Sequence, residues 1–236
     1  MICKNCNNEL HSKYCPDCGQ SAELKRIDGH YIIHEIEHVL HFERGIFFTI
    51  KELCLRPRLT IETFIKEDRS RLVKPVIFII FTSLIYTLSE HFFHLKLSYM
   101  NFERVDDSSF NKIFIWMQEH YGYANILIGI FIAIWIKILF RKHGYNYFEI
   151  LVMLCYTVGI QMLLSSLFVI AEGVTGLGLV KFAGLFGIIY LIWAIGEFFG
   201  RKPMNYFKAL VSMVLGNITT FIMIILFGLI IDVIIH

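Results

Sequence analysis

Long apolar runs separated by short polar segments fill the chain from residue 73 onward, whereas the preceding residues are mixed. A helix crosses a bilayer with about 20 mostly apolar residues. The runs of that length are about 73–93, 123–140, 147–171, 179–199 and 207–235. The pattern therefore predicts an all-α integral membrane protein in which 73–236 forms five transmembrane helices.

The composition agrees with this class of protein. Hydrophobic residues make up 56% of the chain, Phe alone occurs 22 times, and the mean hydropathy is +0.59. A soluble domain of this size does not need so much apolar surface, so the composition excludes an ordinary soluble domain.

Charged residues are placed unevenly between the expected spans. Basic residues gather before the first span, between the second and third, and between the fourth and fifth; they include Arg69, Arg71, Lys74, Arg141, Lys142, Arg201 and Lys202. The other two connecting segments are acidic or neutral. The positive-inside rule then places the N-terminus in the cytosol and the C-terminus outside an inner membrane.

The chain contains an internal repeat, in which 141–152 recurs as 201–211 with one residue deleted. Each copy ends one expected span and opens the next, which predicts two parallel hairpins related by an axis along the membrane normal. We expect Asn146 and Asn205 to cap the helices that follow them, and Tyr147 and Tyr206 to lie in the interfacial aromatic belt. A paired ligand site at this position is the alternative.

A few polar residues occur within the third and fifth expected spans. By the repeat, these residues lie at corresponding depths, and the candidates for a shared intramembrane polar path are Gln161, Ser165, Asn217 and Thr220. The alternative is hydrogen bonding between helices, with close packing at Gly184, Gly187 and Gly196-x3-Gly200. No charged residue occurs at mid-depth.

Residues 23–72 predict amphipathic helices that lie in the inner headgroup layer. The expected helices are Tyr31–His41, Ile46–Leu55 and about Thr60–Lys66, and each is too short to cross a bilayer. Their basic residues would contact anionic lipid.

Four cysteines at the N-terminus, Cys3, Cys6, Cys15 and Cys18, form a CxxC-x8-CxxC array within residues 1–22. Two such pairs can close on one tetrahedral Zn²⁺, and so short a segment needs a metal to hold it folded. The array predicts a zinc ribbon with one structural zinc ion. Two disulfides are the alternative, which a reducing cytosol disfavours. Nucleic-acid binding is not expected, because few basic residues flank the array.

The sequence His34-Glu35-Ile36-Glu37-His38 matches HExxH, the zinc-binding helix motif of metalloproteases. In that interpretation His34 and His38 bind zinc and Glu35 activates a water. The charged Glu37 is unusual for such a helix, and no third ligand is evident. Two alternatives remain open: a second, non-catalytic metal or pH-sensitive site on the face of His30, His34, His38 and His41, and a solvated polar face.

Several segments carry a family resemblance: 37–45, 48–53, Arg56-Pro57 and 69–75. With the ribbon, they resemble an uncharacterised bacterial family of zinc-ribbon membrane proteins with a domain of unknown function. The resemblance covers about residues 1–90. It implies a ribbon, basic juxtamembrane elements and a multi-pass body, and it implies no activity.

We therefore expect a non-enzymatic protein of a bacterial inner membrane, a scaffold, assembly or transport-associated component whose ribbon docks a cytosolic protein. A permease for a small molecule or lipid, built on the two hairpins, is one alternative. A metalloprotease using His34, Glu35 and His38 is the other. The sequence leaves open whether the chain forms a homo-oligomer.

Overall fold

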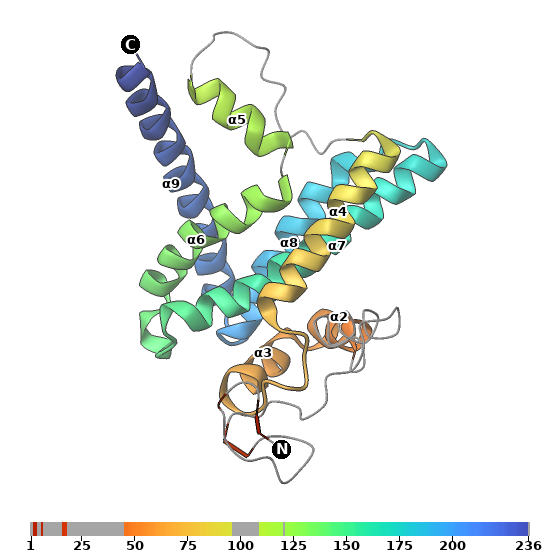
Figure 1. The fold of residues 1–236 in the computed structure, drawn as a ribbon, viewed down its shortest axis with the longest axis vertical. Coiled ribbons are helices and arrows are strands. Elements are labelled where there is room, and N and C mark those ends of the chain that lie inside the picture. The colour runs from red at the N-terminus through yellow and green to blue at the C-terminus, as the bar shows by residue number, and fades with distance from the viewer. Residues whose placement is uncertain are drawn as a thin grey trace. The chain divides into compact units, whose positions relative to one another are not determined.

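The computed structural model describes residues 2, 3, 6, 16, 17, 45–95, 109–119 and 121–235. The chain divides into two compact units, Met1–Glu43 and Arg44–His236, which are described separately. In the first unit the described residues all belong to the predicted ribbon, and Cys3 is buried. In the second unit every regular element of the described ranges is a helix (Figure 1).

The helices of the second unit follow the predicted order. Their bounds are α2 Ile46–Leu55, α3 Pro57–Lys66, α4 Pro75–Phe93, α5 Ser109–Glu119, α6 Tyr121–Leu139, the 3₁₀ turn η2 Arg141–His143, α7 Tyr147–Thr175, α8 Val180–Phe198 and α9 Pro203–Ile235. Four of them, α4, α7, α8 and α9, are long and apolar enough to cross a membrane. Apolar side chains such as Leu185, Ile222 and Leu226 are exposed on α8 and α9. These features indicate a membrane protein. The apolar part of α6, Ala124–Leu139, is shorter.

Local sequence explains where these helices begin and end. Pro57 and Pro75 occupy the first turns of α3 and α4, where the missing N–H costs no hydrogen bond. Gly176 and Gly200 adopt the left-handed conformation that ends α7 and α8. As a result α3 begins three residues before its predicted start, and α7 extends four residues past its predicted end at 171.

Helix α5 was not predicted, because the length rule for membrane spans does not detect a helix of 11 residues. It packs against α9, and the backbone N–H of Ser109 donates to Asp232 Oδ1 at 3.1 Å.

The four helices of the two hairpins form a closed ring. Helix α6 packs on α7, α7 on α8, α8 on α9, and α9 returns to α6. Helix α4 lies outside this ring against α7, and the two run side by side in the same direction (Figure 1). The absence of a side chain at Gly159 permits this contact, since a Cβ there would lie 2.6 Å from the ring of Phe78.

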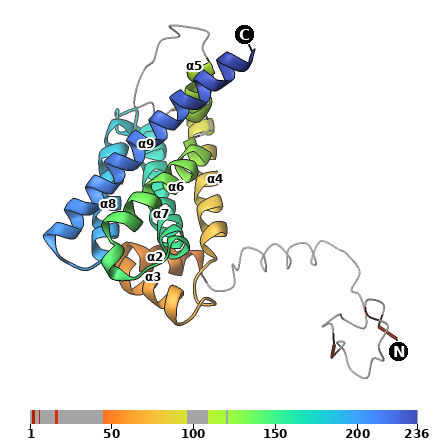
Figure 2. The ribbon, with the colours of Figure 1, turned by 90° about the vertical axis from the view of Figure 1, so that its left-hand side faces the viewer.

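Both hairpin turns lie at the end of the second unit that also holds α2 and α3, hereafter the turn end (Figure 2). Phe140 of one turn stacks on Phe199 of the other, with ring centroids 4.0 Å apart. The hydroxyl of Tyr145 donates to Glu62 of α3 at 2.7 Å. Burial, then the hydrogen bond to Glu62, raises the pKa of Tyr145, so the phenol remains the donor. Helix α3 therefore braces the hairpins from outside the ring.

The start of α4 is fixed at the same end. The buried hydroxyl of Tyr156, in α7, donates to the carbonyl oxygen of Val73 at 2.8 Å. Thr49 of α2 accepts from the backbone N–H of Val73 at 3.2 Å. Residue 73 is thus held by one helix of the ring and one of the short helices.

Candidate functional site

A cavity of about 370 Å³ lies between the four helices of the ring. Each helix contributes to its wall: Asn125, Ile128, Gly129 and Ile132 from α6, Val158 and Gln161 from α7, Gly184, Ile188 and Leu191 from α8, and Met213 and Asn217 from α9. Its volume falls at the low end of the range for small-ligand pockets, about 300–1,000 Å³.

Three carboxamide side chains from three different helices reach this cavity: Asn125, Gln161 and Asn217. Gln161 is the central residue of α7, which runs from Tyr147 to Thr175. No charged side chain belongs to the wall. The cavity is therefore apolar with uncharged groups that can both donate and accept hydrogen bonds.

The three amides differ in how far the protein itself satisfies them. Gln161 Nε2 donates to Ser165 Oγ at 3.4 Å, and Asn217 Nδ2 donates to the carbonyl of Met213 at 2.8 Å. Asn125 Nδ2 is buried, and none of the described residues accepts a hydrogen bond from it. A buried donor left without an acceptor is destabilising, by roughly 1–3 kcal/mol. A ligand with an acceptor oxygen would remove this penalty.

Two glycines shape the interior. A Cβ added at Gly187 would lie 3.0 Å from Cγ of Gln161, so this glycine lets α8 approach the Gln161 side chain. Gly129 is buried, yet a Cβ added there would meet nothing within 4 Å. The empty space of the cavity therefore begins at Gly129.

The cavity opens toward the outer surface of the helices. Of the residues in its wall, Ile188 of α8 and Asn217 of α9 are exposed, and α8 and α9 are neighbours in the ring. Side chains of α8 and α9 therefore belong both to the cavity wall and to the outer surface. In a bilayer this surface faces lipid rather than water.

Two of the four residues predicted to form a polar path reach the cavity, Gln161 and Asn217. Ser165 is buried and serves as the partner of Gln161. Thr220 is also buried, but its hydroxyl donates to the carbonyl of Gly216 within α9, and it does not belong to the cavity wall. The sequence prediction missed Asn125, although an Asn within an expected span is itself a signal.

The repeat residues have different roles. Asn146 caps α7: its Oδ1 accepts from the N–H of Glu149 at 2.9 Å, and Glu149 accepts from the N–H of Asn146 at 2.7 Å. The corresponding prediction for Asn205 was wrong, because α9 already begins at Pro203. Asn205 Nδ2 instead donates to the carbonyls of Phe199 and Gly200, each at 2.8 Å, and so closes the end of α8.

The aromatic partners of these asparagines differ as well. Tyr147 donates to the carbonyl of Ile130 at 3.2 Å. The hydroxyl of Tyr206 donates to Glu197 at 3.3 Å. Glu197 also accepts a hydrogen bond from Arg201 Nε at 2.7 Å. The corresponding asparagines and tyrosines of the two repeat copies therefore make different contacts.

The predicted metal ligands fall mostly outside the described residues. This applies to Cys15 and Cys18 of the ribbon and to the helix predicted at 31–41 with His34, Glu35 and His38. Of the ribbon, Cys3 is buried and Cys6 partly buried. Within the described ranges no group of three or more His, Cys, Asp or Glu side chains is placed to hold a metal ion.

Comparison with known proteins gives one family. Residues 43–87 match the model of a protein of unknown function (DUF3667). The matched segment contains α2, α3 and most of α4 and ends before the helices that enclose the cavity. No curated protein and no solved structure matches the chain.

Proposed function

We propose that this membrane protein carries a lipid with an uncharged, hydroxyl-rich headgroup, which enters the ring cavity from the bilayer between α8 and α9. The observation that carries the proposal is the convergence of Asn125, Gln161 and Asn217 on one cavity inside the apolar helices. Intramembrane polar groups that face a cavity typically line a substrate path.

The chemistry of the wall defines the ligand class. A charged headgroup would meet no countercharge there, and its desolvation would be unfavourable. Hydroxyl groups match carboxamides, because each can donate and accept, and Asn125 Nδ2 offers an unused donor. The exposure of Ile188 and Asn217 supports a mouth at these residues and entry from the lipid phase.

We further propose five spans in a bacterial inner membrane, with the N-terminus in the cytosol and the C-terminus outside. Helices α4 and α7 run in the same direction, so the chain must return between them, and α6 is the helix that does so. The basic residues Lys74, Arg141 and Arg201 flank elements of the turn end, which supports its assignment to the cytosolic side. The recurrence of 141–152 as 201–211 in the sequence supports a pseudo-twofold relation between the two hairpins.

A flip assay in proteoliposomes tests the carrier. The probes are a glycosyl diacylglycerol and phosphatidylglycerol, both labelled with a fluorophore that dithionite bleaches only in the outer leaflet. We expect faster flipping of the glycolipid than of the anionic lipid. The double variant Gln161→Leu/Asn217→Leu should lose this acceleration.

A matched pair of variants separates the cavity mouth from general damage. Ile188→Trp places a bulky ring at the proposed mouth, whereas Ile189→Trp places it at the next exposed position of α8, outside the cavity wall. Flipping should fail only in Ile188→Trp. Equal rates in the two variants, or equal rates for the two lipids, would end the proposal.

The zinc ribbon is a second, independent proposal. Cys3, Cys6, Cys15 and Cys18 would hold one structural Zn²⁺, and the folded ribbon would dock a cytosolic protein in the scaffold role. Support comes from the spacing of the four thiols. Replacing all four by Ser should leave lipid flipping intact and abolish capture of that partner.

A further inference from the structure

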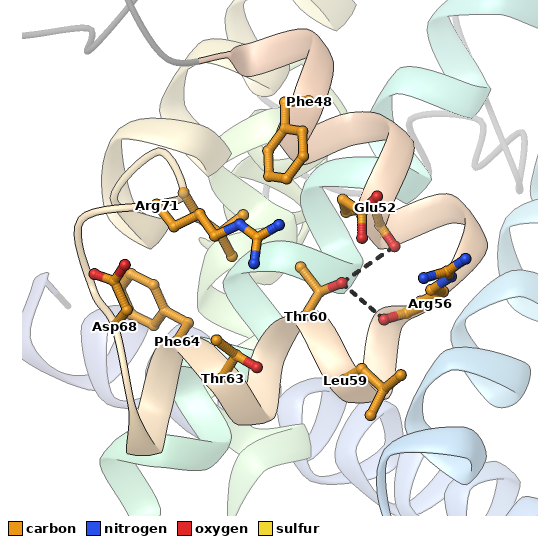
Figure 3. A pocket seen from close by; sticks show the side chains of 10 residues that line it. Phe48, Glu52, Arg56, Leu59, Thr60, Thr63, Phe64, Asp68 and Arg71 are labelled. Atoms are coloured by element: carbon orange, nitrogen blue, oxygen red, sulfur yellow. Dashed lines mark hydrogen bonds between the residues drawn. The ribbon is translucent and has the colours of Figure 1, made fainter.

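A second pocket, of about 180 Å³, lies at the turn end between α2, α3 and the segment 67–72. Phe64 and Leu72 are buried in its wall. Thr60 secures the corner between the helices, since its hydroxyl donates to the carbonyls of Glu52 and Arg56 at 3.3 and 2.8 Å (Figure 3). This pocket lies within the family-matched segment and is separate from the ring cavity.

An arginine is held over this pocket by an aromatic ring. The Arg71 guanidinium carbon lies 5.2 Å from the centroid of the Phe48 ring, and the group points into the pocket between Phe48 and Thr60 (Figure 3). A cation–π contact holds a guanidinium near the ring and leaves N–H groups that do not face the ring free to donate. The guanidinium fork of arginine is well suited to bind the oxygens of a phosphate.

The other charged side chains around the pocket give it groups of both signs. Arg56 lies at the rim, and the half-buried Glu52 stands across the pocket from Arg71 (Figure 3). Asp68 turns away from Arg71 (Figure 3) and accepts from the N–H and hydroxyl of Ser70 at 2.8 and 2.7 Å. The pocket thus offers the N–H groups of Arg71 on one side and the carboxylate of Glu52 on the other, with Arg56 at the rim beyond Glu52.

The surface around this pocket is suited to lipid. Phe47, Leu55 and Leu59 are 79%, 62% and 61% exposed. Leu59 belongs to the pocket wall itself, and Leu55 follows Glu52 by about one helical turn. Large apolar side chains exposed beside basic residues are typical of helices that lie at the boundary of headgroups and acyl chains.

We propose that this pocket binds the headgroup of an amine-bearing phospholipid, of the phosphatidylethanolamine class. Arg71 takes the phosphate, Glu52 on the facing side takes the ammonium group, and the acyl chains leave along Leu59 and Leu55. The site stands independently of the ring cavity, whose wall carries no charge. It gives the short helices a specific lipid ligand in place of general contact with anionic lipid.

Native mass spectrometry of the full-length protein in mild detergent tests this site. The protein is titrated with phosphatidylethanolamine, phosphatidylcholine and phosphatidylglycerol that have identical acyl chains. We expect one phosphatidylethanolamine to be retained about tenfold more tightly than the other two lipids. Equal retention of all three would overturn the proposal, because it would indicate only surrounding bilayer lipid.

Variants of Arg71 and Glu52 test which residue binds the phosphate and which binds the ammonium group. Arg71→Ala should weaken phosphatidylethanolamine about tenfold or more, whereas Arg69→Ala, an exposed arginine of the same segment outside the pocket, should not. Glu52→Gln should remove the preference for the amine headgroup while phosphatidylglycerol still binds. An equal loss in Arg69→Ala, or displacement of the lipid by an equal concentration of soluble glycerophosphoethanolamine, would reject a phospholipid site.

Discussion

Phe140 and Phe199 stack almost face to face, with their ring planes 17° apart. Each ends the first helix of one hairpin, and both are buried, at 3% and 5% exposure. This contact joins the two turns directly and adds to the contacts that α6 and α8 make with α9. It links the ends of α6 and α8 across the ring at the turn end.

The coupling between these two rings can be measured. Phe140→Leu and Phe199→Leu should each destabilise the protein, and the double variant should lose less than the sum of the two. We expect a coupling free energy of about 0.5–1.5 kcal/mol. Thermal unfolding in detergent for the four proteins of the cycle gives this value, and strict additivity would show that the rings act separately.

The two repeat asparagines should differ in how well they tolerate substitution by Asp. Asn146 acts as an acceptor at a helix start, where Asp serves equally well, so Asn146→Asp should change stability by less than about 0.5 kcal/mol. Asn205 acts as a donor to two carbonyls, and Asn205→Asp replaces that donor with a carboxylate, which should cost about 1–3 kcal/mol. Unfolding midpoints of the two variants provide the test. If Asn205→Asp lowers stability no more than Asn146→Asp does, Asn205 does not act through its amide.

Replacing two helix glycines by Ala should change the stability of the protein in opposite directions. Gly129→Ala adds a methyl group to empty space, and the better helix propensity of Ala should stabilise by about 0.5–1 kcal/mol. Gly216→Ala would place Cβ 2.8 Å from the backbone Cα of Ile132, an atom that cannot move aside, and should cost about 1–3 kcal/mol. If thermal unfolding shows a gain for both variants, α6 and α9 are less closely packed at Gly216 than described.

Sequence patterns predicted the bounds of the helices better than which helices pack against one another. The bounds of α2 were predicted to the residue, because Gly45 precedes it and Arg56-Pro57 begins the next helix. The order of packing around the ring was not predicted. Helices such as α8 are apolar on every side, and lipid and protein both accept apolar side chains, so periodicity does not reveal which face is buried.

The candidate site was predicted in part for the same reason. Gln161 and Asn217 were recognised as polar residues at similar depth, and the structure brings both to one cavity. Asn125 lies near the start of its span, and only the packing of α6 against its neighbours places it there. The error at Asn205 has a local cause: the repeat lost one residue, and Pro203 then supplied an earlier helix start.

Tyr156 should contribute to the position of α4 through one hydrogen bond. Its ring is fully buried against Phe64 and Phe78, so Tyr156→Phe removes the hydroxyl and leaves the packing intact. The carbonyl of Val73 then loses its 2.8 Å partner, which should cost about 1–2 kcal/mol. Tyr190→Phe is the matched control, because the bond of Tyr190 to the carbonyl of Leu53 is longer, at 3.4 Å, and its loss should cost less. An equal cost in the two variants would contradict the greater contribution expected of the Tyr156 bond.

The amount of zinc per protomer tests both metal predictions at once. Elemental analysis of purified full-length protein should give one zinc, because the four thiolates of Cys3, Cys6, Cys15 and Cys18 complete a tetrahedral shell. The variant His34→Ala/His38→Ala should also retain one zinc, and Cys3→Ser/Cys6→Ser should retain none. Two zinc ions in the wild type and one in the histidine variant would establish a second metal site, and Glu35→Gln would then decide whether that site cleaves peptides. One zinc that is lost with the histidines and kept without the cysteines would contradict the ribbon.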